Sequence, residues 1–222
     1  MWPLILLLCP ATLAAAEVQA HGLLFERWLC VTFFGGHQPG GYTQKWDIPA
    51  EANVAHGGIP VNPKAVKHGA PIGLGDALRQ HDIAEPFLLI IGAWEQADAK
   101  TKRWVNARAA RVEPAQWRAL WGGVTRADLE RLDAVVKDKA LTLEEARARA
   151  QAMKTQPPFT TAVIQLNPKI DRSQRRLQCS LRFDDFFTHL APGAPRGRLE
   201  RPEIFGVPLP GSFASGARSF QK

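Results

Sequence analysis

Three residues in the first third of the chain have the types that metal-assisted cleavage of a phosphodiester requires. Asp47 lies in the sequence KWDIP, a Gly-Gly turn follows at 57–58, and Lys64 lies in the extended run 59–67. Glu26, in a stretch with helical periodicity, adds a second carboxylate. Carboxylates are ligands that Mg²⁺ prefers, and a bound divalent ion makes water nucleophilic beside a phosphodiester. The spacing predicts that a carboxylate and an ammonium meet at one edge of a hairpin.

Each of these side chains also has a purely structural interpretation. Glu26 is interpreted equally well as a helix-surface acid that pairs with Arg27. Asp47, which precedes Ile-Pro, has the alternative role of a turn residue that caps a local amide. Lys64 and Lys67 have the alternative role of solvated charges that protect an edge strand from aggregation.

The order of the residues resembles that of the PD-(D/E)XK nuclease superfamily, which includes many restriction endonucleases. The family core begins with a helix bearing a Glu and continues with a hairpin that has the Asp on one strand and (D/E)-x-K on the next. Glu26 matches the helix Glu, Asp47 matches the Asp, and the run from Asn62 to Lys64 occupies the place of (D/E)-x-K. The resemblance covers roughly residues 17–112.

This resemblance implies an Mg²⁺-dependent endonuclease that cleaves DNA, with Mn²⁺ as the alternative cofactor. Glu26, Asp47 and Lys64 are then the expected catalytic residues, and Glu26 and Asp47 are also expected to bind the metal. The chain departs from the family at Asn62, whose amide oxygen can bind Mg²⁺ but brings no charge. Asp76 is the best substitute for the missing acid, although it is interpreted equally well as a helix N-cap.

The charge of the chain favours an anionic partner. The 222 residues carry a formal net charge of +7 and the pI is about 9.7, which is typical of proteins that bind nucleic acid or other polyanions. DNA is the expected partner, and a homodimer is left open. A solvated loop is the alternative interpretation of the basic run near 172–176. The residues expected to contact nucleic acid are Lys67, Arg79, Arg172, Arg175, Arg176 and Gln178.

Two other functions remain open beside the nuclease. One is a non-catalytic, exported α/β protein that binds an anionic ligand through its basic surface, and the other is a hydrolase of a different fold that uses the same acids. The sequence contains no G-x-S-x-G, phosphate-binding loop, dinucleotide fingerprint, Cys-x-x-Cys or His-Glu-x-x-His.

The first 16 residues carry no charge and end in three alanines, which is typical of a secretory leader cleaved before Glu17. This predicts a secreted or periplasmic protein. The alternative is that the stretch begins the first helix of a cytoplasmic protein. The apolar run is too short for a membrane span. Cys30 and Cys179 are expected either to form one disulfide or to remain as two buried thiols.

The remaining pattern predicts an α/β fold in which a single mixed sheet is flanked by helices and has a restriction-endonuclease-like core. One domain is expected over 17–190, followed by an extended, mostly coreless tail at 191–222 that is rich in Pro, Gly and Arg. The tryptophans at 94, 104, 117 and 121 are expected to pack in the core. Strands are expected at 42–48, 59–67, 87–94, 104–112, 159–166 and 177–183, and helices at 17–34, near 76, and at 113–121, 125–138, 142–153 and 184–190.

Overall fold

The protein is described from a computed structural model that covers residues 10–38 and 45–215, with side chains from residue 22 onward. Its α-helices are α1 (Pro10–Phe33), α2 (Ala77–His81), α3 (Pro114–Ala119), α4 (Arg126–Lys137), α5 (Leu143–Lys154) and α6 (Phe183–Asp185), the last continued by a π-helical turn at Phe186–Leu190. Short 3₁₀ turns occur at Ala50–Ala52, Val54–His56 and Phe159–Thr161. The strands are β1 (Val61–Lys67), β2 (Ile72–Asp76), β3 (Phe87–Gln96), β4 (Thr101–Val112), β5 (Gln165–Ile170), β6 (Arg175–Leu181), β7 (Glu203–Ile204), β8 (Val207–Pro208) and β9 (Ser212–Ala214).

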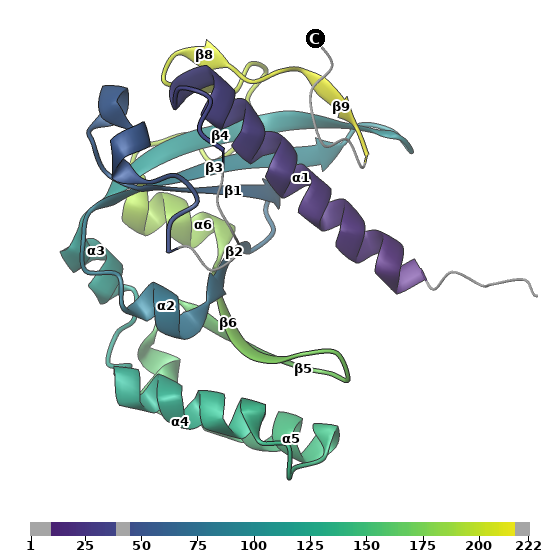
Figure 1. The fold of residues 1–222 in the computed structure, drawn as a ribbon, viewed down its shortest axis with the longest axis vertical. Coiled ribbons are helices and arrows are strands. Elements are labelled where there is room, and N and C mark those ends of the chain that lie inside the picture. Colours follow the sequence, from purple (N-terminus) through teal and green to yellow (C-terminus); the bar gives the residue numbers. More distant parts are fainter. Residues whose placement is uncertain (1–9, 39–44, 216–222) are drawn as a thin grey trace, which may run out of the picture.

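The strands form a mixed α/β architecture with helices on the outside (Figure 1). The largest sheet has the order β1-β3-β4-β9, in which β1 runs parallel to β3 and the other pairs are antiparallel. An antiparallel sheet has the order β2-β6-β5, and β7 pairs with β8. The expected mixed α/β class is therefore confirmed, but the strands are divided among three sheets instead of one.

Strand β3 is the centre of the largest sheet, as its sequence FLLIIGAW predicts. Its residues Phe87 to Ala93 are all buried, because α1 covers one face of the sheet and the rest of the domain covers the other. Strand β1 lies at the edge of this sheet, where Pro63 can be accommodated without breaking a ladder. The predicted partner strand at 104–112 is β4, which begins three residues earlier.

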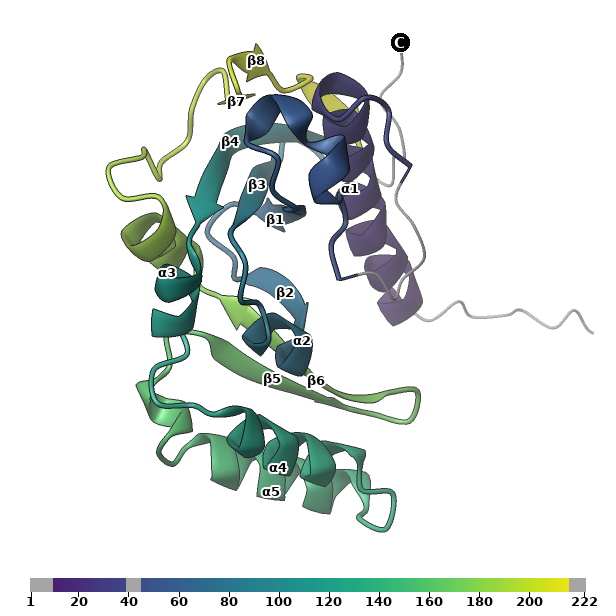
Figure 2. The ribbon, with the colours of Figure 1, turned by 60° about the vertical axis from the view of Figure 1, so that its left-hand side comes forward.

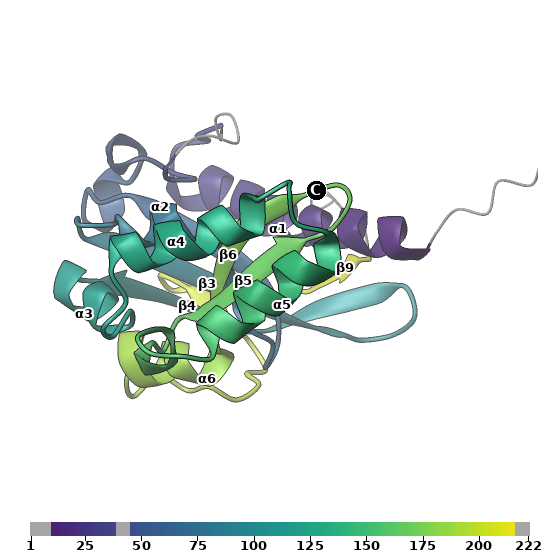
Figure 3. The same ribbon diagram turned by 90° about the horizontal axis from the view of Figure 1, so that it is seen from below.

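Helices α4 and α5 cover one face of the β2-β6-β5 sheet (Figure 3). Both begin with a capping box, in which Thr125 and Thr142 each accept a bond from the backbone three residues ahead. Leu129, Leu132 and Val136 of α4 pack into a cluster with the inner side chains of β5 and β6. Trp117 and Trp121 are about 1% exposed in this cluster, so the prediction that they pack in the core is confirmed.

Helix α1 covers one face of the β1-β3-β4 layer (Figure 2), and the other face of this layer packs against the cluster that contains α4 and α5. Phe25 and Leu29 are one turn apart and both are buried against β1, β3 and β4. Phe25 lies directly on Gly92, where a Cβ atom would come within 2.7 Å of the ring. The rings continue from Phe25 to Trp104 at 5.2 Å and from Trp104 to Phe213 at 4.8 Å. The first helix is therefore packed on a cluster that includes the last strand.

Three local expectations were wrong. The strand expected at 42–48 reduces, over its described residues, to one antiparallel bridge between Ile48 and Val61, because residues 45–47 bend; residues 42–44 lie outside the described part. The strand expected at 159–166 begins at Gln165, since Phe159–Thr161 forms a 3₁₀ turn. Strand β2 was not expected, because its glycines weaken the strand pattern.

The segment expected to be a coreless tail contributes to the core as far as residue 215. Ile204, Leu209 and Phe213 are 1%, 7% and 5% exposed, and β9 extends the largest sheet beside β4. These apolar side chains are spaced too widely in a Pro-rich and Gly-rich segment to show a periodic pattern. Residues 216–222 of the predicted tail lie outside the described part of the chain.

Cys30 and Cys179 are both buried and free, so of the two alternatives the pair of buried thiols is the one observed. They belong to different apolar clusters: Cys30 lies on α1 and Cys179 lies on β6. No helix among the described residues is long and apolar enough to cross a membrane.

Candidate functional site

Asp47 and Lys64 are brought together at the open edge of β1. The backbones of Ile48 and Val61 exchange two hydrogen bonds, with N···O distances of 3.2 and 2.8 Å, which hold the Asp47 segment against the start of β1. Lys64 Nζ donates to Asp47 Oδ2 at 3.0 Å, and both side chains are partly buried. The predicted meeting of a carboxylate and an ammonium is therefore observed, although Asp47 lies in a bend and not on a paired strand.

Glu26 of α1 faces the same pair. The pKa of the half-buried Glu26 carboxyl is raised from 4.5 to about 7, mainly by burial and also by the negative charge of Asp47, while Lys64 partly opposes both effects. All three predicted catalytic residues thus interact electrostatically, from three elements that are separate in the sequence. Two carboxylates with one ammonium leave an excess of negative charge in a partly desolvated place.

Asn62 lies on the same side of β1 as Lys64, because the two are two residues apart on a strand. Its side chain is 3% exposed, so its amide faces the interior and not bulk water. Asn62 thus stands, buried, at the position where the family pattern has an acid.

Asp76 ends β2 and serves as the N-cap of α2. Its Oδ1 accepts a hydrogen bond from the Arg79 backbone N–H at 2.9 Å. The capping interpretation offered by the sequence is thus correct. The other interpretation is that Asp76 supplies the charge that Asn62 lacks. Among the interactions of the described residues, none joins Asp76 to Glu26, Asp47 or Lys64.

The donor atoms around Asp47 suit a hard divalent cation. Among the described residues no group of three His, Cys, Asp or Glu side chains is placed to hold a metal ion. Mg²⁺, however, usually takes only one or two protein carboxylates and completes its shell with water and substrate phosphate. Glu26 and Asp47 are the two carboxylates here that could serve as such ligands, and Asn62 offers a neutral amide oxygen on the same side of β1 as Lys64.

Cys30 is a neighbour of the site that sequence reasoning did not include. It lies one helical turn after Glu26, and burial raises the pKa of its thiol to about 12, with Glu26 and Asp47 adding to the effect. The thiol therefore stays protonated at neutral pH and does not act as a nucleophile. The i, i+4 spacing from Glu26 is the signal in the sequence that could have identified it.

The residues expected to contact nucleic acid are distributed over three elements. Lys67 ends β1 and is exposed, and Arg79 lies on the exposed side of α2. Arg172 is in the β5–β6 turn, and Arg176 is exposed on β6. Arg175 instead donates to the backbone carbonyls of Asp138 and Leu141, so it ties the α4–α5 turn to the sheet. Gln178 is half-buried on β6 beside Asp76 of β2.

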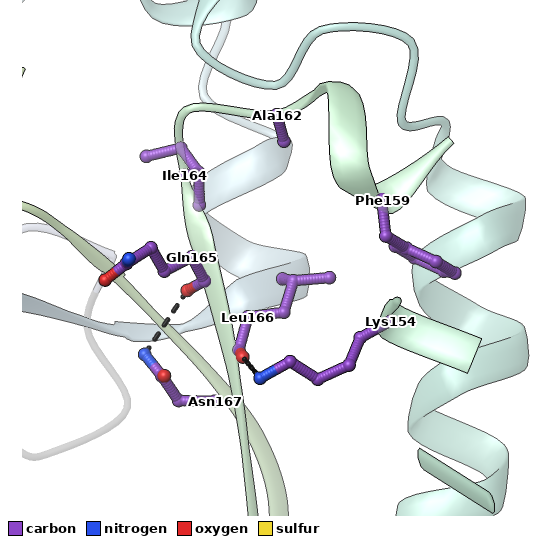
Figure 4. Close-up of a pocket in the computed structure, with 7 residues that line it drawn as sticks. All are labelled: Lys154, Phe159, Ala162, Ile164, Gln165, Leu166 and Asn167. Atoms are coloured by element: carbon purple, nitrogen blue, oxygen red, sulfur yellow. Dashed lines mark hydrogen bonds between the residues drawn. The ribbon is translucent and has the colours of Figure 1, made fainter. Parts of the chain in front are cut away.

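A cavity of about 270 Å³ lies elsewhere, between the end of α5 and β5 (Figure 4). Its one ionisable group is Lys154, whose Nζ donates to the Leu166 carbonyl at 2.8 Å. Asn167 on the other wall donates to the Gln165 carbonyl at 3.2 Å. Asn167 also donates to the Ser180 hydroxyl at 2.8 Å, so the Lys154 and Asn167 side chains are both hydrogen-bonded within the protein. Its lining residues are Lys154, Phe159, Ala162, Ile164, Gln165, Leu166 and Asn167.

No protein-family model, curated protein or solved structure matches the chain. The resemblance to the PD-(D/E)XK nucleases therefore rests on the residues of this chain alone.

Proposed function

We propose that the protein is a metal-dependent nuclease that cleaves phosphodiester bonds in DNA, with a restriction-endonuclease-like core formed by α1, β1, α2 and β3. The observation that carries the proposal is the convergence of Glu26, Asp47 and Lys64. These residues were selected from the sequence by chemical type and order, and they interact electrostatically in the fold with a Lys64–Asp47 distance of 3.0 Å. An accidental choice of one helix acid, one turn acid and one strand lysine would rarely converge in this way.

Each residue has a distinct role in this proposal. Glu26 and Asp47 would hold Mg²⁺ or Mn²⁺, with the Asn62 amide oxygen beside them. When bound, the ion supplies positive charge that activates water and stabilises a phosphate. Lys64 orients the Asp47 carboxylate through their hydrogen bond, and its remaining N–H donors are available to a phosphate oxygen.

Plasmid cleavage in Mg²⁺ and in Mn²⁺ tests the proposal, with the full chain compared with Asp47→Asn and Lys64→Ala. Removing either group should lower the cleavage rate by roughly a hundredfold or more, since such losses are typical when groups that stabilise charge in the transition state are removed. The Lys45–Glu85 pair, at 2.7 Å, is a matched control, because Lys45→Ala removes an equivalent ion pair from the surface. That variant should cleave at the wild-type rate.

Two outcomes contradict the nuclease. One is cleavage that persists unchanged in Asp47→Asn and Lys64→Ala, which would indicate a contaminating enzyme or a different site. The other is a folded wild-type chain that cleaves no DNA in either metal. If that chain still binds a polyanion, the alternative of a non-catalytic protein with a basic binding surface is favoured.

A further inference from the structure

The β2-β6-β5 sheet has one covered face and one polar face. Helices α4 and α5 cover the face that carries Leu166, Ile170 and Leu177. The other face is turned toward the side of the molecule on which α1 lies, and Figures 1 and 2 show the β5–β6 hairpin projecting there beyond its neighbours. Alternation along the strands assigns to this polar face the residues Asn167, Lys169, Arg176, Gln178 and Asp76.

Two like charges are paired directly across the hairpin. Lys169 of β5 is the register partner of Arg176 of β6, and both side chains are exposed. Like charges opposite one another in an antiparallel pair are destabilising, by up to about 1 kcal/mol. Neither residue has an acidic partner among the described residues, so the fold itself does not offset this repulsion.

The nearest acids on this hairpin and face form no ion pair with Lys169 or Arg176. Asp171, in the hairpin turn, accepts hydrogen bonds from Ser173 and Gln174, and these bonds hold its pKa at about 2. Asp76 lies at the far edge of the same face, beyond Gln178, and caps α2. The pair and its polar neighbours thus form a positively charged surface with hydrogen-bonding amides beside it.

We propose that this face, defined by Asn167, Lys169, Arg176 and Gln178, is the surface that binds the phosphate backbone of duplex DNA. The inference rests on the proposed function for its choice of DNA as the anion, and charge complementarity is its physical basis: two adjacent cations match successive phosphates and release counterions when DNA binds. Gln178 adds an amide next to the cations, while its register partner Asn167 donates to the Gln165 carbonyl and the Ser180 hydroxyl. The face also lies on the side of the fold on which α1 lies (Figure 1).

The test measures binding without catalysis. A short fluorescein-labelled duplex is titrated in EDTA with the wild-type chain and with the double variant Lys169→Gln/Arg176→Gln, over a series of salt concentrations. Loss of two phosphate contacts should weaken binding roughly tenfold to a hundredfold at low salt and lower the slope of log K against log[salt] by about 1.8. The matched control, Lys139→Gln/Arg149→Gln, removes the same charge from the α4–α5 layer on the opposite face and should bind as the wild type does.

The results separate this inference from the nuclease proposal. Wild-type affinity in Lys169→Gln/Arg176→Gln, or an equal loss in both double variants, overturns the assignment of this face even if Asp47→Asn abolishes cleavage. Conversely, a selective loss in the face variant supports the surface even if no metal-dependent cleavage is found. Binding of anionic lipid vesicles through the same two residues, with no binding of duplex DNA, also overturns the inference.

Discussion

Replacing Glu26 with Gln should make the protein more stable above neutral pH and leave its stability nearly unchanged near pH 4.5. The pKa of Glu26 rises from 4.5 to about 7 in the folded protein. Between these values the folded state binds the proton more tightly than the unfolded state, so the free energy of unfolding falls as pH rises. Below pH 4.5 the Glu26 carboxyl does not lower the free energy of unfolding, and above pH 7 the full reduction is present.

The size of the effect follows from the same values. Each pKa unit corresponds to about 1.4 kcal/mol, which gives an upper limit of about 3 kcal/mol for ionising Glu26 in the folded protein. Glu26 is only half-buried, so solvent screening reduces this to about 2 kcal/mol. For a chain of this size that corresponds to a Tm difference of about 4–8 °C at pH 8.

Urea denaturation in EDTA at pH 5, 6, 7 and 8 measures this difference between Glu26→Gln and the wild type. The control is Glu130→Gln, which removes an exposed carboxylate from the surface pair with Arg126 and should change stability by no more than about 0.5 kcal/mol. A difference for Glu26→Gln that stays constant with pH, or a variant less stable than wild type at pH 8, would refute the placement of Glu26 beside Asp47 in a desolvated site.

Two further predictions concern the packing that holds Glu26 in place. Gly92→Ala should destabilise the fold by about 1–3 kcal/mol in chemical denaturation, because the new methyl would lie within 2.7 Å of the Phe25 ring; Gly197→Ala, with no neighbour within 4 Å, is the control. Phe213→Ala should lower the free energy of unfolding by about 3 kcal/mol, since the ring is buried against Trp104; a change below about 0.5 kcal/mol would show that the C-terminal segment does not pack as described.

Elements with a strong local signal were predicted well from the sequence. The unbroken apolar run at Phe87 had to be a central strand, and Thr125 and Thr142 each mark a helix start by a cap that needs no tertiary contact. Strand β2 and the C-terminal segment were missed for the opposite reason. Their glycines and prolines weaken the local pattern, and Phe213 is buried only because β4 is there to receive it.

The candidate site, too, could be predicted only in part from the sequence. The types and order of Glu26, Asp47 and Lys64 are visible in the sequence, and so is the substitution at Asn62. The raised pKa of Glu26 cannot be predicted from the sequence, because it depends on how deeply the packing of α1 on the sheet buries the carboxyl and on which charges then lie nearby. Lys169 could not be singled out either, since only the register of β5 with β6 sets it opposite Arg176.

The aromatic series from Phe25 through Trp104 to Phe213 has a consequence for the order of folding. It joins the helix that bears Glu26 to one of the last strands of the chain, so the packing beneath that helix involves contacts of very high sequence separation. Contacts of this kind form late, after loop-closure entropy has been overcome. During synthesis, α1 has no complete surface to pack on until residues near 213 have emerged. We therefore expect a growing chain to complete the packing beneath Glu26 only after residues near 213 have left the ribosome.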